Sequence, residues 1–76
     1  MPYASNTELP KGVKNHLPAH AQAIYREAFN HAWEFYRNPR KRKPGMKREE
    51  TAHSVAWAAV ESKYHKDDKT GEWVQN

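Results

Sequence analysis

The chain of 76 residues contains no cysteine. Disulfides and thiolate-bound metals are therefore excluded, and the sequence suits a reducing compartment. Long apolar runs are also missing, because the longest, residues 55–60, is far shorter than the about 20 residues of a membrane-spanning helix. Residues 1–4 lack the basic and apolar regions of a secretory signal. We expect a soluble, cytoplasmic protein that does not span a membrane.

The sequence also lacks the motifs that carry common catalytic chemistry. It has no nucleophile elbow and no glycine-rich phosphate loop. A chain of this length buries only about 60% of the surface that its unfolded form exposes, so its core is thin. Such a core rarely encloses a pocket for a substrate. We therefore expect no enzymatic activity, no cofactor and no small-molecule substrate.

The apolar pattern predicts a mainly α fold in a single domain, residues 1–76. An apolar residue at every fourth position indicates a short first helix over about residues 8–16, with its stripe at Leu9, Val13 and Leu17. Pro18 ends this helix and can start the next, because the first helical turn does not need its missing N–H.

The second helix has the strongest helical pattern and is predicted to end near Arg37. Its apolar residues recur at intervals of three and four, at Ala21, Ile24, Tyr25, Ala28, Phe29, Ala32, Phe35 and Tyr36. Trp33 lies on the flank of this stripe. The helix ends here because Pro39 disfavours helical geometry at Asn38.

The third helix is predicted to begin near Lys47 and is rich in alanine. Its inner stripe consists of Ala52, Val55, Ala56, Ala59, Val60 and Lys63, with His53 and Trp57 on the flank. Small residues on this helix would face the aromatic residues of the second helix, which fills a core efficiently. The predicted structural core contains Tyr25, Phe29, Trp33, Val55, Ala56, Trp57 and Ala59.

The two chain ends indicate a minor two-stranded sheet. Glu72, Trp73 and Val74 are typical of a short strand, and Tyr3 near the start of the chain would pair with Trp73. Such a ribbon needs the helices beneath it for stability. The predicted fold is thus a small three-helix domain, with a short first helix, two long helices and this minor sheet from the chain ends.

A positive segment separates the second and third helices. Positions 37–48 hold no acid and seven basic residues, Arg37, Arg40, Lys41, Arg42, Lys43, Lys47 and Arg48, whereas the rest of the chain has a formal charge of −3. Residues 38–47 form a predicted basic linker with Pro39, Pro44 and Gly45. The linker can be a solvated connection, a phosphate-binding loop for DNA or RNA without sequence preference, or a segment attracted to anionic membranes.

Five histidines raise the question of a metal site. His16 and His20 are four apart, but Pro18 breaks the helix between them, and no zinc-hydrolase motif is present. A closed zinc site needs four ligands. The acids within residues 67–72 do not have EF-hand spacing and indicate a surface turn. We expect no metal, with His20 and His53 partly buried and hydrogen-bonded.

Motifs over nearly the whole chain are similar to those of a known family. They are Met1-Pro2-Tyr3, Leu9-Pro10, residues 17–22, Ile24-Tyr25, residues 27–30, Ala32-Trp33, residues 49–53, residues 55–60 and a late tryptophan, Trp73. Together they resemble the ChaB family. The resemblance implies a small, mainly helical cytoplasmic protein with a minor sheet, which regulates a ChaA-type cation/proton antiporter. It implies no catalytic residues.

Two functions follow from these observations. The first is a non-enzymatic regulatory protein that docks on a cation antiporter or another protein, through the exposed polar face of the second helix near Trp33. The second is a nucleic-acid-binding protein that acts through residues 37–48. Viral members of the family look like nucleic-acid binders, which favours the second function. The linker favours it too, because it carries only basic residues, whereas the enterobacterial pattern mixes acidic and basic residues there.

Overall fold

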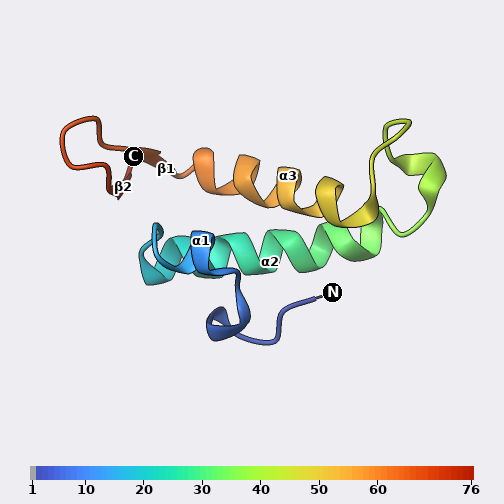
Figure 1. Ribbon diagram of the computed structural model, residues 1–76, viewed down its shortest axis with the longest axis horizontal. Helices are drawn as coiled ribbons and strands as arrows, with labels where there is room; N and C mark the ends of the chain where they lie inside the picture. The colour runs from blue at the N-terminus through green and yellow to red at the C-terminus, as the bar shows by residue number, and fades with distance from the viewer. Residues whose placement is uncertain (1) are drawn as a thin grey trace.

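The computed structural model describes residues 2–76. Its elements in chain order are η1 (Asn6–Glu8), α1 (Lys11–Lys14), α2 (Ala19–Phe35), η2 (Pro39–Lys41), α3 (Arg48–Glu61), β1 (Tyr64–Lys66) and β2 (Trp73–Gln75). The two long helices lie side by side and run in opposite directions (Figure 1). The turn that contains η2 lies at one end of this pair, and the β1–β2 hairpin lies at the other (Figure 1). The predicted three-helix domain with a minor sheet is confirmed.

The first helix is shorter than the sequence predicts. In place of one helix over residues 8–16, the chain forms η1 and the four-residue α1. Leu9 between them is extended, with φ −65° and ψ 152°, because the ring of Pro10 disfavours helical geometry at the residue before it. The predicted stripe of Leu9, Val13 and Leu17 is nevertheless buried. A helical break thus leaves the apolar contacts intact.

The second and third helices begin and end close to the predicted positions. Pro18 is the N-cap of α2 rather than its first residue. Beyond α2, Asn38 is extended (φ −79°, ψ 121°), as expected before Pro39. The Asn38 side chain accepts a hydrogen bond from the Arg40 N–H at 3.0 Å and so starts η2. The linker is therefore folded into a short helical turn.

The core lies between α2 and α3 and is continued by α1. Of the predicted core residues, Tyr25, Phe29 and Ala56 are buried, while Trp33, Val55, Trp57 and Ala59 are half-buried. Ala52 and Val60 are also fully buried, in agreement with the predicted inner stripe of α3. Two stripe positions were wrongly predicted, since Lys63 is exposed and Phe35 is 51% exposed. Both lie at the last turn of their helix or just beyond it, where no partner element covers them.

The predicted pairing of the two chain ends is wrong. Trp73 pairs with Lys66, because β1 and β2 form an antiparallel hairpin within the last part of the chain. The strand at Tyr64–Lys66 was not predicted, since it directly follows α3 in a polar stretch. Tyr3 lies on α2 instead: its N–H donates to Asn30 Oδ1 at 2.7 Å, and Asn30 Nδ2 donates to the Tyr3 carbonyl at 2.8 Å.

Candidate functional site

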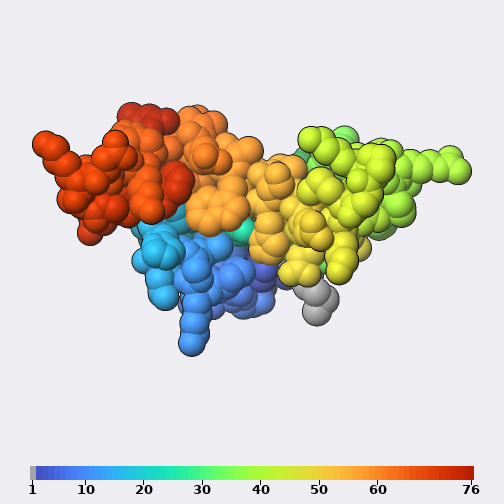
Figure 2. All heavy atoms as spheres, turned by 45° about the horizontal axis from the view of Figure 1, so that its top comes forward, coloured from blue at the N-terminus to red at the C-terminus, as the bar shows by residue number. Residues whose placement is uncertain are grey.

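The basic segment forms the turn at one end of the helix pair. Five of its seven basic side chains are exposed, namely Arg37, Arg40, Lys41, Lys43 and Lys47, while Arg42 and Arg48 are half-buried. Figure 2 shows this end of the molecule, coloured green to yellow, with side chains that project from the surface. The turn itself is ordered, since Met46 N–H donates to the Lys43 carbonyl at 3.1 Å and Gly45 has φ 84°, which favours glycine. The segment is therefore a compact positive surface.

Two members of the segment rest on aromatic rings. Arg48 lies with its guanidinium 4.0 Å from the centre of the Trp33 ring, and its Nε donates to the Trp33 carbonyl at 2.8 Å. Lys41 Nζ lies 4.6 Å from the centre of the Phe35 ring. A cation over an aromatic face gains about 0.5–1 kcal/mol at an exposed site. Arg48 therefore joins α3 to α2, and the five exposed basic residues carry the accessible charge.

A surface hollow of about 240 Å³ lies between the basic turn and α3. Its lining contains the side chains Lys41, Arg42 and Lys43 from the turn, the hydroxyl residues Thr51 and Ser54 from α3, and the apolar or aromatic residues Tyr36, Met46 and Val55. No carboxylate belongs to this lining. The sequence identified the three basic residues, whereas the other five come from three separate parts of the chain and were not predicted as neighbours.

Arg42 has an unsatisfied donor beside this hollow. Its Nε is buried and has no hydrogen-bond partner within residues 2–76. A buried donor without a partner costs about 1–3 kcal/mol, and more when the group is charged. Folded proteins hold few such groups, so each one calls for a physical reason. An anionic ligand in the adjoining hollow would supply the missing acceptor.

A second hydrogen-bonded group lies between the long helices. The Tyr25 hydroxyl bonds Nδ1 of His53, and Nε2 of His53 lies 3.7 Å from the carboxylate of Glu49. Burial raises the pKa of Tyr25 well above its ordinary value of 10.0, and the nearby Tyr3 adds to this effect. Tyr25 therefore stays protonated, and its hydroxyl shares a hydrogen bond with His53 Nδ1. Tyr25, His53 and Glu49 do not line the hollow beside the basic turn, and the Tyr25–His53 bond joins α2 to α3.

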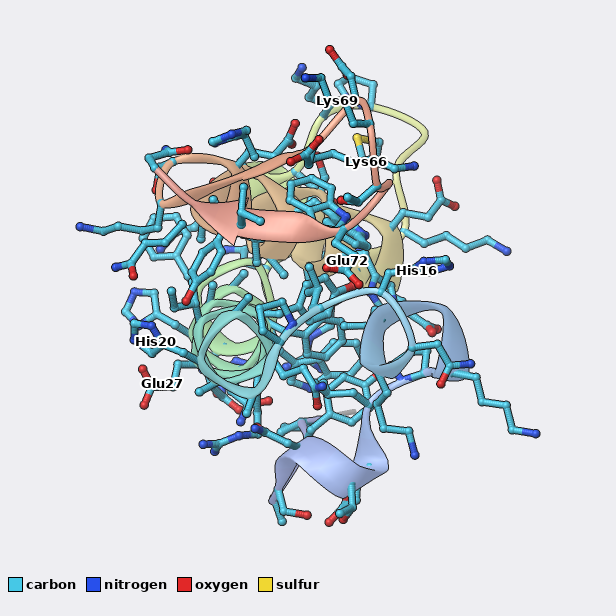
Figure 3. All side chains as sticks on the ribbon, turned by 90° about the vertical axis from the view of Figure 1, so that its left-hand side faces the viewer. His16, His20, Glu27, Lys66, Lys69 and Glu72 are labelled. Atoms are coloured by element: carbon cyan, nitrogen blue, oxygen red, sulfur yellow. The ribbon has the colours of Figure 1, made fainter. Side chains whose placement is uncertain are left out.

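The histidines agree in part with the sequence analysis. His53 is half-buried and hydrogen-bonded, as predicted. His20 is hydrogen-bonded to the Tyr64 hydroxyl at 2.9 Å, but it is more exposed than predicted. His16 and His20 lie on opposite sides of the molecule (Figure 3), because Pro18 separates their helices. Within residues 2–76, no three His, Asp or Glu side chains come together in an arrangement that could hold a metal ion.

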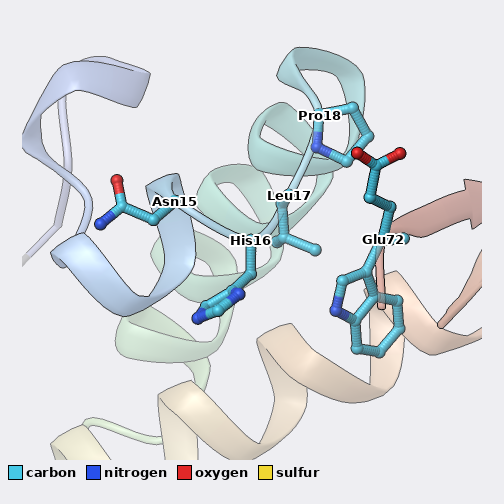
Figure 4. A pocket seen from close by; sticks show the side chains of 6 residues that line it. Asn15, His16, Leu17, Pro18 and Glu72 are labelled. Atoms are coloured by element: carbon cyan, nitrogen blue, oxygen red, sulfur yellow. The ribbon is translucent and has the colours of Figure 1, made fainter. Parts of the chain in front are cut away.

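A larger hollow of about 310 Å³ lies between the α1–α2 connection and the hairpin. It is lined by Asn15, His16, Leu17, Pro18, Glu72 and Trp73. Figure 4 shows the His16 ring and the Glu72 carboxylate pointing apart, so this pair does not converge on one ligand atom. The acidic stretch of residues 67–72 forms a surface turn, as predicted, since Asp67 Oδ1 accepts a hydrogen bond from the Lys69 N–H at 2.7 Å.

The residues that the structure describes include no helix long and apolar enough to cross a membrane. The family model described as ChaB matches residues 9–76. Proteins named "Putative cation transport regulator ChaB" from Escherichia coli K12 and from Shigella flexneri are each 54% identical over 68 residues, which cover 90% of this chain and 90% of theirs. A solution NMR structure of a protein with this name superimposes with a TM-score of 0.81, at 49% identity and over 99% of each chain. This chain therefore belongs to the ChaB family.

Proposed function

We propose that this protein is a small, non-enzymatic, cytoplasmic regulator of cation transport. The observation that carries the proposal is its 54% identity, over 90% of its length, to relatives that are named as cation transport regulators. We infer that it acts by contact with another protein, a cation/proton antiporter in the first place. These relatives are named as regulators and not as enzymes, which favours a protein that acts by binding.

The exposed side of α2 is the docking surface of this proposal. Its outer stripe, defined here as His20, Glu27, His31 and Glu34, is exposed and lies along one side of the helix, near Trp33. His20 and Glu27 project from the same side of the molecule (Figure 3). Cytoplasmic loops of membrane proteins carry an excess of Lys and Arg, which suits an acidic stripe. Opposite charges would then steer and orient the encounter.

Co-purification with the antiporter of the host tests this function. The native protein is expected to retain the antiporter, and the double variant Glu27→Lys, Glu34→Lys to lose it, because like charges then face each other. A matched control is Glu50→Lys with Glu61→Lys, which makes the same charge change on exposed positions of α3. Unchanged cation efflux in a strain that lacks the protein would contradict the proposal.

A second candidate function is sequence-independent binding of nucleic acid by residues 37–48. Five exposed basic residues and the 51% exposed ring of Phe35 favour it, because cations hold phosphates and aromatic rings stack on unpaired bases. The basic residues have no neighbouring acid in this segment.

Titration with labelled single- and double-stranded DNA at two salt concentrations tests this candidate. Replacement of Arg40, Lys41, Arg42 and Lys43 by Gln is expected to abolish binding. Each phosphate contact that is lost should reduce the steepness of the plot of log binding constant against log salt concentration by about 0.7–0.9. The control replaces four exposed lysines elsewhere, Lys11, Lys63, Lys66 and Lys69, with the same total charge change. Binding that survives in the first variant would exclude this mechanism.

A further inference from the structure

The hollow between the basic turn and α3 has the features of an anion-binding site. Three adjacent basic residues, Lys41, Arg42 and Lys43, belong to its lining, and no acidic residue does. The Nζ of Lys41 lies over the ring of Phe35, which is not part of the lining. The acids nearest to the lining in the sequence are Glu34, two residues before Tyr36, and Glu49 and Glu50 in the first turn of α3. All three are exposed, and Glu49 lies 3.7 Å from His53. The local charge therefore favours an anion over a cation or a neutral ligand.

Arg42 gives this hollow a specific donor in addition to its charge. Its Nε is buried and unpaired within residues 2–76, although folded proteins satisfy almost all such groups. A guanidinium presents parallel N–H groups that match two oxygens of a phosphate or carboxylate. Because Nε is buried, the side chain would have to rotate toward the hollow for one anion to accept from Nε and from a terminal nitrogen together.

The remaining lining indicates what else the ligand contains. Ser54 offers an exposed hydroxyl from α3, which can donate to a phosphate oxygen. Tyr36, Met46 and Val55 form an apolar wall, which suits a carbon body attached to the anionic group. The volume of about 240 Å³ is just below the about 300–1,000 Å³ of sites for drug-sized ligands, so the ligand is small.

We propose that this hollow binds the phosphate monoester group of a small phosphorylated molecule. A monoester carries about −1.5 to −2 charges at pH 7, so the basic residues of the lining attract it more strongly than a diester with its single charge. The proposal is independent of docking by the outer stripe of α2, because the hollow lies between the basic turn and α3. Binding here would make the protein responsive to a phosphorylated metabolite.

The test is an NMR titration of the full chain with phenyl phosphate, at an ionic strength held constant with sodium chloride. We expect saturable shifts at the amides of Arg42, Ser54 and Val55. Arg42→Gln is expected to weaken binding about tenfold, since it removes a charge-assisted bidentate contact. The matched control is Arg40→Gln, which removes the same charge from the same turn at an exposed position outside the lining. This control is expected to change the affinity less than about twofold, because it removes only a screened long-range attraction.

A second variant covers the case that Arg42→Gln does not fold. Ser54→Ala keeps the helix, because alanine has the highest helix propensity, and is expected to weaken binding severalfold. Equal weakening by Arg40→Gln and Arg42→Gln would overturn the proposal, as would shifts that grow linearly without saturation. Saturable binding of a phosphodiester oligonucleotide without binding of phenyl phosphate would also overturn it and would favour the nucleic-acid candidate. Shifts caused only by anionic lipid vesicles would assign the turn to a membrane surface and exclude a small ligand.

Discussion

At the scale of single residues, Tyr25 shows how the core accommodates a polar group. Its side chain is fully buried, with the rings of Phe29 and Trp57 at centroid distances of 6.5 and 5.2 Å. Its hydroxyl is satisfied by His53 Nδ1, which lies at the edge of the core and has a 28% exposed side chain. The hydrogen bond thus connects the interior to the half-exposed flank of α3. Burial favours the neutral phenol, and this has a measurable consequence at high pH.

We predict that Tyr25→Phe lowers the free energy of unfolding by about 1 kcal/mol at pH 7, because His53 loses a hydrogen-bond partner. The folded pKa of Tyr25 is raised, so its contribution is fully present below pH 10.0 and is lost as the pH rises further. Ionisation in the unfolded state alone should cost the native protein about 1 kcal/mol between pH 10 and 11. Urea unfolding, followed by tryptophan fluorescence from pH 7 to 11, measures both effects. Parallel pH profiles for the two proteins would contradict this prediction.

At the scale of elements, the two long helices meet along a seam of small against large residues. Ala52 and Ala56 of α3 are completely buried, as are Tyr25 and Phe29 of α2. All four belong to one apolar cluster. Alanine lets the backbone of α3 come close to α2, and the aromatic rings fill the space that remains. The close approach also explains why the seam tolerates little additional volume.

We predict that Ala56→Leu destabilises the protein by about 1–3 kcal/mol, because extra methylene groups in a packed core force side chains out of their preferred rotamers. Ala58→Leu makes the same change two residues further along α3, at an exposed position, and should stay within about 0.5 kcal/mol of the native protein. Thermal unfolding by circular dichroism compares the two variants. Equal midpoints for both would show that α2 does not pack closely on this face of α3.

The sequence predicts the long helices well because their apolar period extends over four or more turns. It predicts short elements less well, because the conformational effect of a single residue such as proline can then outweigh the apolar pattern. Pro10 forces Leu9 into an extended conformation, although Leu9 belongs to the apolar stripe with Val13 and Leu17 that predicted a continuous helix. Phe35 shows a different limit: a stripe position is buried only where a partner covers it, and at the last residue of α2 the chain turns away.

The candidate site was also predicted only in part from the sequence. Composition alone identifies the basic segment, but contacts between residues far apart in the chain decide which side chains remain available. Arg48 reaches back fifteen residues to Trp33, which no local pattern indicates. Ser54 and Met46 line the same hollow as Arg42 because α3 folds back beside the turn, and no local sequence pattern predicts this proximity.

At the scale of the whole molecule, the basic turn and the hairpin lie at opposite ends of the longest axis (Figure 1). The molecule measures 41 × 24 × 18 Å. The hairpin is anchored by Trp73, whose ring lies 5.7 Å from that of Trp57 in α3. The N-terminal arm, residues 2–8, is anchored separately, by Tyr3 on Phe29 at 4.7 Å and by the two hydrogen bonds with Asn30. The N-terminal arm is thus held by α2, whereas the hairpin is held by α3 through Trp73 and by α2 through the Tyr64–His20 hydrogen bond.

We predict that Asn30→Ala releases the N-terminal arm and leaves the hairpin in place. The substitution removes both hydrogen bonds that hold the Tyr3 backbone, at a cost of about 1–3 kcal/mol, since each contributes about 0.5–1.5 kcal/mol. Local opening needs less free energy than global unfolding, so the arm should open by itself. Hydrogen exchange would then speed up at Tyr3, with little change at Val74. The change across η1 should be smaller than at Tyr3, because Arg26 Nε still donates to Asn6 Oδ1 at 2.9 Å.

The matched control for this prediction is His31→Ala, at the exposed neighbouring position of α2, which should leave the exchange of both chain ends unchanged. Equal loss of protection at Tyr3 and Val74 in Asn30→Ala would mean that the arm and the hairpin open together. Such coupling could pass along α2, because Tyr3 is hydrogen-bonded to Asn30 of α2 and Tyr64 of β1 is hydrogen-bonded to His20 of the same helix. Separate opening would instead show that contacts at one chain end can change without disturbing the seam between the long helices.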